Sequence, residues 1–107
     1  MYVVTRSDLT PGQQATQAVH AAFCFARSFA PVIAQWVDHS NYLVLLSVPS
    51  EPDLEALADR AATIGIRHPR FIEPDWDDAM TAVALEPGTA ARKLCANLPL
   101  ALKGVSA

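Results

Sequence analysis

Three polar side chains that could take part in hydrolytic chemistry recur at helical spacing near the N-terminus. Gln13, Gln17 and His20 follow a Pro11–Gly12 pair, which is a common way to open a helix. Residues three and four positions apart share one side of a helix, so these side chains should form a single stripe. Amide and imidazole groups in such a stripe could stabilise an oxyanion or move a proton.

A second group of candidates lies in the acidic segment Glu73 to Asp78 (EPDWDD) and just after it. A carboxylate from Glu73 or Asp75 could orient or activate an attacking water. Thr81 follows at the start of an apolar run. We expect these residues to face the helical stripe across the edge of a sheet, and so to complete one cleft.

Each candidate also has a purely structural interpretation. Gln17 could be a solvated amide, and His20 could be a packed histidine bonded to the backbone. Asp8 could hold its turn or pair with Arg6. The acidic segment could be a solvated loop.

Motifs for several other kinds of site are absent. The sequence contains no P-loop, GxGxxG, GxSxG or HExxH pattern. Cys24 and Cys95 form no CxxC pair and have no partners at metal-ligand spacing. We therefore expect free thiols, no bound metal and no cofactor.

Size and charge limit the choice of partner. A chain of 107 residues predicts one domain, residues 1–107, and its formal charge of -3 gives no overall basic character. Binding of RNA would need local cations. The candidates for that role are Arg6, Arg27, Arg92 and Lys93. Without an apolar stretch of the roughly 20 residues that a membrane span needs, or a signal-peptide pattern, we expect no membrane partner and a cytoplasmic protein.

Strands and helices alternate along the predicted chain. Apolar, β-rich stretches predict strands at 2–5, 42–48, 66–72 and 81–85, the second central because it is apolar on both faces. Helices are predicted at 12–29, 32–37, from Ser50 to Gly65, and at 89–96. The expected fold is an α/β three-layer sandwich with a four-stranded mixed sheet and helices on both faces.

Within the first helix, the pattern predicts a buried apolar side and an opposite polar stripe. The stripe holds Gln13, Gln17 and His20. The residues expected on the buried side are Ala15, Ala18, Val19, Ala22, Ala26 and Phe29.

The segment Arg6-Ser7-Asp8-Leu9, with Gly12, Ala15, Gln17 and His20-Ala21-Ala22 after it, resembles the opening of the type II peptidyl-tRNA hydrolases. The likeness extends over about residues 2 to 90 and includes Thr81 to Pro87. It implies hydrolysis of the ester that joins a peptide to the 3′ end of tRNA.

The resemblance also locates a departure. The family's catalytic lysine follows the glycine that opens the helix, and Gln13 occupies that position here. Glu73 or Asp75 takes the place of the family's aspartate, and Thr81 matches a threonine. The resemblance and this departure lead to two candidate functions. The chain is either a peptidyl-tRNA hydrolase or a non-catalytic module that binds RNA, a nucleotide or a protein. A homodimer is a further expectation.

Overall fold

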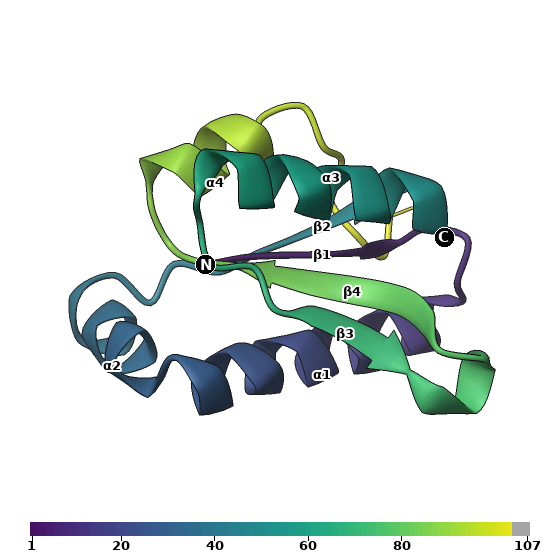
Figure 1. Cartoon of the computed structure of the whole chain (residues 1–107), viewed down its shortest axis with the longest axis horizontal. Coiled ribbons are helices and arrows are strands. Elements are labelled where there is room, and N and C mark those ends of the chain that lie inside the picture. Colours follow the sequence, from purple (N-terminus) through teal and green to yellow (C-terminus); the bar gives the residue numbers. More distant parts are fainter. Residues whose placement is uncertain (104–107) are drawn as a thin grey trace.

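The computed structural model describes residues 1–103, which form a four-stranded sheet between two pairs of helices (Figure 1). The strands are β1 (Tyr2–Arg6), β2 (Val44–Val48), β3 (Arg70–Glu73) and β4 (Ala79–Leu85). The helices are α1 (Pro11–Ser28), α2 (Ala30–His39), α3 (Glu51–Ile64) and α4 (Thr89–Leu94), with a short 3-10 turn, η1, at Pro74–Trp76. Helices α1 and α2 cover one face of the sheet, and α3 and α4 cover the other.

The sheet is mixed, as predicted. Its strand order is β2-β1-β4-β3, with β1 parallel to β2 and antiparallel to β4, and β3 antiparallel to β4. The third predicted strand is shorter than expected: β3 begins only at Arg70, after Pro69, although the carbonyls of Arg67 and Pro69 already accept the N–H groups of Glu86 and Ala84. The outer position of β3 is one that a strand next to proline can occupy.

The prediction that 42–48 forms a central strand is wrong, because β2 lies at the end of the strand order. Its outer edge is nevertheless covered by the chain near the C-terminus. The Ser47 N–H donates to the Pro99 carbonyl at 2.9 Å, and the Ala101 N–H donates to the Leu45 carbonyl at 2.9 Å. This cover explains why the end of an edge strand can be buried and apolar.

The predicted burial of α1 is also wrong in part. Val19 is 52% exposed, whereas Gln17, expected in the polar stripe, is only 2% exposed. The residues of α1 that are buried are Gln14, Gln17, Ala18, Ala21 and Phe25. The helix is therefore rotated relative to the expected orientation. Its two buried amides find hydrogen-bond partners there, Gln17 on the sheet and Gln14 at Leu9 and Leu102.

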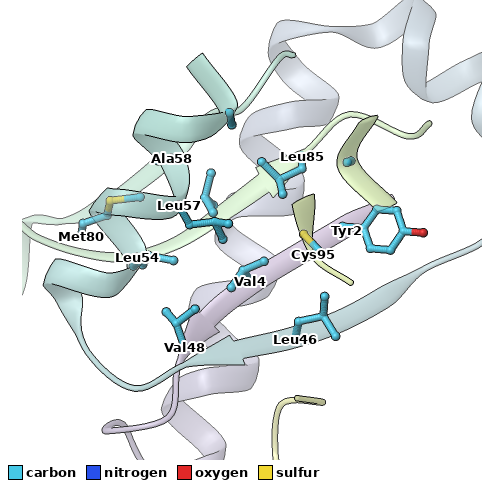
Figure 2. Close-up of a cluster of buried hydrophobic side chains, with 13 residues drawn as sticks. Tyr2, Val4, Leu46, Val48, Leu54, Leu57, Ala58, Met80, Leu85 and Cys95 are labelled. Atoms are coloured by element: carbon cyan, nitrogen blue, oxygen red, sulfur yellow. The ribbon is translucent and has the colours of Figure 1, made fainter. Parts of the chain in front are cut away.

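The other face of the sheet carries the larger apolar core (Figure 2). Val4 from β1 and Leu85 from β4 pack there against Leu54 and Leu57 of α3. Helix α3 ends at Gly65, whose φ of 82° lies in the left-handed region that glycine adopts readily. This core fixes the sheet from which the site residues project.

Candidate active site

Three of the candidate residues, Gln17, Glu73 and Thr81, meet at one end of the sheet, where β1 ends and β4 begins. The turn from Arg6 to Thr10 leads into α1 there, and β3 passes through η1 into β4 (Figure 1). Three different elements therefore supply the side chains of the site: α1 carries Gln17, the end of β3 carries Glu73 and β4 carries Thr81.

Gln17 joins these elements through its side-chain amide. The Thr81 hydroxyl donates to Gln17 Oε1 at 2.7 Å, and Gln17 Nε2 donates to Glu73 Oε1 at 3.1 Å. Gln17 and Thr81 are both buried. Among the residues described, no buried side-chain nitrogen or oxygen lacks a partner. The amide is thus held in one orientation by a donor on one side and an acceptor on the other.

The network continues on both sides of this amide. The Thr5 hydroxyl donates to the Thr81 carbonyl at 2.9 Å, which ties the site to the central strand β1. Glu73 is only partly buried, and its second oxygen, Oε2, accepts the Asp75 N–H at 3.4 Å. A carboxylate has about four acceptor positions, so Glu73 retains the capacity to hold a water.

Gln13 has a structural role at the start of α1. Its N–H donates to Thr10 Oγ1 at 3.2 Å, and its Oε1 accepts the Thr10 N–H at 3.0 Å. This reciprocal pair is a capping box, which satisfies donors that every helix start leaves open. Gln13 is exposed and makes no hydrogen bond to Gln17 or Glu73.

His20 and Asp75 lie close to the network without joining it through their side chains. The His20 ring stacks on Phe71 of β3, with ring centroids 4.5 Å apart and planes 8° from parallel. Asp75 is exposed in η1 and contributes only its backbone N–H to Glu73. Of the six side chains predicted for catalysis, the structure therefore links Gln17, Glu73 and Thr81 directly.

Arg6 is fixed beside these residues by an ion pair. Its guanidinium makes two hydrogen bonds to Asp8, at 3.0 and 2.9 Å, and a third to the Met80 carbonyl at 3.2 Å. The hydrogen bond to Asp8 raises the pKa of Arg6, and the negative charges of Asp8 and Glu51 act in the same direction. The guanidinium remains charged and ties the turn to the start of β4.

Comparison with known proteins identifies the family of this chain. The family model described as peptidyl-tRNA hydrolase PTH2 matches residues 1–98. The chain belongs to the PTH2 family. No curated protein matches the sequence significantly. The match includes the turn, helix α1, the acidic segment and strand β4, which supply the network around Gln17.

Two residues of this PTH2 chain that sequence reasoning missed also help to build the site. Glu51, at the start of α3, accepts the Met80 N–H at 2.6 Å. Gln14 is buried, and it donates to the Leu9 carbonyl at 2.8 Å while its Oε1 accepts the Leu102 N–H at 3.2 Å. Gln14 lies three, four and seven positions before Gln17, Ala18 and Ala21, so it shares their side of the helix. A correct prediction of which side of α1 faces the sheet would therefore have included Gln14.

The cations of the PTH2 chain do not form one patch. Arg27 is exposed in the last turn of α1, whereas Arg92 and Lys93 are exposed on α4, across the sheet from α1. Within residues 1–103, no group of three or more acidic, histidine or cysteine side chains is arranged to hold a metal ion. In the same range, no helix combines the length and apolar character that membrane crossing requires.

Proposed function

We propose that this PTH2 chain hydrolyses the ester between a peptide and the 3′ end of tRNA. The observation that supports the proposal is the network in which Gln17 holds the Glu73 carboxylate and the Thr81 hydroxyl. A fixed, partly exposed carboxylate beside an amide donor suits addition of water to an ester carbonyl.

In the proposed reaction, Glu73 orients a water and accepts its proton as the oxygen adds to the ester carbonyl. Amide and backbone N–H groups stabilise the resulting oxyanion, and Gln17 Nε2 has a second N–H for this task. The intermediate then expels the ribose 3′ oxygen, which takes up the proton. The products are a peptide with a free carboxylate and tRNA with a free 3′ hydroxyl.

The test is release of labelled peptide from peptidyl-tRNA by the purified protein and by two matched variants. Glu73→Gln keeps a hydrogen-bond acceptor but removes the base, and should lower turnover by about 10²–10⁴-fold. Asp75→Asn alters the neighbouring carboxylate and should change turnover little. If Asp75→Asn alone abolishes turnover, Asp75 is the base. If the unaltered protein does not exceed hydrolysis in buffer, the catalytic proposal fails.

A second candidate function is a non-catalytic module that binds RNA, a nucleotide or a protein. Gln13 favours it, because a neutral amide tied to Thr10 stands where the family resemblance implies a lysine cation. The Gln13→Lys variant separates the two functions. A large gain in hydrolysis would show that the remaining groups are arranged for catalysis, whereas no hydrolysis by either protein would support the binding module.

For the tRNA partner, we propose that Arg27 supplies the first phosphate contact. It lies on the helix that also carries Gln17, and Arg6 lies at the site itself, although paired with Asp8. Arg92 and Lys93 would take part where the RNA also reaches α4. We further propose a cytoplasmic location, in keeping with the free thiols of Cys24 and Cys95.

We also propose that the protein forms a homodimer through an apolar surface beside α1. Val19, Phe23 and Leu43 are exposed there, and a hollow of about 230 Å³ lies between α1, α2 and the start of β2. Exposed apolar surface of this kind often marks an interface. Light scattering of the protein and its Phe23→Ser variant tests the proposal, which fails if the unaltered protein is a monomer at high concentration.

A further inference from the structure

A polar hollow lies at the opposite end of the sheet from Gln17. Its volume is about 320 Å³, and its walls come from the start of β1, the chain before β2 and the start of α4. The polar side chains that line it are those of Tyr2, Ser40, Tyr42, Thr89 and Arg92. Tyr2 and Arg6 are the two ends of β1, so at the strand rise of about 3.3 Å per residue their backbones are about 13 Å apart.

Tyr2 presents an unused polar group at this hollow. The residue is only 8% exposed, and its ring belongs to the apolar core beside α4. Its hydroxyl points out of that core, as Figure 2 shows. No hydrogen bond links this hydroxyl to another of residues 1–103, and because no buried side-chain oxygen in that range lacks a partner, the hydroxyl is open to solvent. It is therefore free to donate a hydrogen bond to a ligand in the hollow.

Arg92 supplies positive charge to the same place. It is the only charged side chain among those that line the hollow, and no described residue forms an ion pair with it. Ser40 adds a hydroxyl that accepts the Tyr42 N–H at 3.2 Å and still has its own proton to donate. The Thr89 hydroxyl lines the hollow as well.

We propose that this hollow is a binding site for a phosphate group. Arg92 offers several N–H donors, and the hydroxyls of Tyr2, Ser40 and Thr89 offer three more. Such a set suits a ligand with several acceptor oxygens and negative charge. The phosphate belongs either to a small molecule such as a mononucleotide or to an RNA strand. The site does not depend on the proposed hydrolysis.

The first experiment titrates the isotope-labelled full chain with inorganic phosphate and follows the backbone amide resonances. Saturable shifts should be largest at Tyr2, Gly88 and Thr89. Tyr2→Phe removes only the hydroxyl and should weaken binding about 2- to 10-fold, whereas Arg92→Gln should weaken it by about 10-fold or more. Lys93→Gln is the matched control, because it removes a neighbouring cation that does not line the hollow, and should leave affinity within about 2-fold.

The second experiment distinguishes the sources of the phosphate. Adenosine monophosphate and a short RNA without terminal phosphates compete separately with inorganic phosphate. If only the mononucleotide competes, the natural ligand is a phosphate monoester. If the RNA competes, and Arg92→Gln abolishes that competition, the ligand is the phosphate backbone of an RNA strand. Absence of saturable phosphate binding overturns the proposal. The proposal is also overturned if Tyr2→Phe and Arg92→Gln both leave phosphate affinity unchanged. It is overturned as well if Lys93→Gln weakens phosphate binding as much as Arg92→Gln does.

Discussion

Gln17 Nε2 donates a hydrogen bond to Glu73 Oε1 at 3.1 Å, and so joins α1 to the end of β3, 56 positions later in the sequence. The same amide accepts from Thr81 on the adjacent strand. One side chain therefore both fastens α1 to the sheet and holds the carboxylate in place. This dual role leads to the first prediction.

Gln17→Ala should destabilise the protein by about 1–3 kcal/mol. The substitution leaves the buried Thr81 hydroxyl without its acceptor and opens a small cavity. Denaturant unfolding measures the change. Gln35→Ala, at an exposed position on α2, is the matched control and should cost less than about 0.5 kcal/mol. Equal effects of the two substitutions would show that the buried network contributes nothing specific.

Thr10→Ala should cost about 1 kcal/mol, because it removes the side-chain oxygen that accepts the Gln13 N–H at the start of α1. Thermal or denaturant unfolding will report the loss. Thr16→Ala serves as the control, since Thr16 is exposed within the same helix and alanine is the better helix former. Loss of stability in Thr16→Ala but not in Thr10→Ala would contradict the capping role.

Stability should fall as the pH rises from about 9 to about 11, through Cys95. Burial raises the pKa of this thiol from 9.0 to about 11. Between these values the unfolded chain has lost the proton that the folded chain keeps, so the contribution is complete below pH 9 and lost toward pH 11. The two-unit difference corresponds to at most about 3 kcal/mol.

Comparison with Cys95→Ala isolates this effect from other groups that titrate in the same range. The difference in unfolding free energy between the two proteins should shrink across the window. A difference that stays constant with pH would show that Cys95 ionises equally in both states. Cys24, which is only partly buried, should react with a thiol reagent at pH 8 well before Cys95 does.

Arg27→Gln should weaken RNA binding and lower the slope of log affinity against log salt by about 0.7. Arg27 lies on the helix that carries Gln17, so RNA held at the candidate site should pass near it. Lys93→Gln provides the comparison, because Lys93 lies on α4, across the sheet. Titration of a tRNA-like hairpin at several salt concentrations measures both variants. An unchanged slope in Arg27→Gln would exclude this helix as the contact surface.

Much of the local structure could be predicted from the sequence. Such features depend on residues that are close together in the sequence. They include the cap at Thr10, the end of α3 at Gly65 and the alternation of strands and helices. The sequence, together with the resemblance to type II peptidyl-tRNA hydrolases, predicted six catalytic side chains, of which the structure links three, Gln17, Glu73 and Thr81. These features follow from backbone preferences and from a recognisable order of residue types.

Only the tertiary structure decided which side of α1 is buried and which strands are central. Gln14 and Gln17 look like surface residues in the sequence, because their hydrogen-bond partners lie in distant segments. Burial of an amide is unfavourable until such partners are present, so hydrophobic periodicity alone predicts the wrong side. In the same way, β2 looks central because the apolar pattern cannot show that the segment near Pro99 covers its edge.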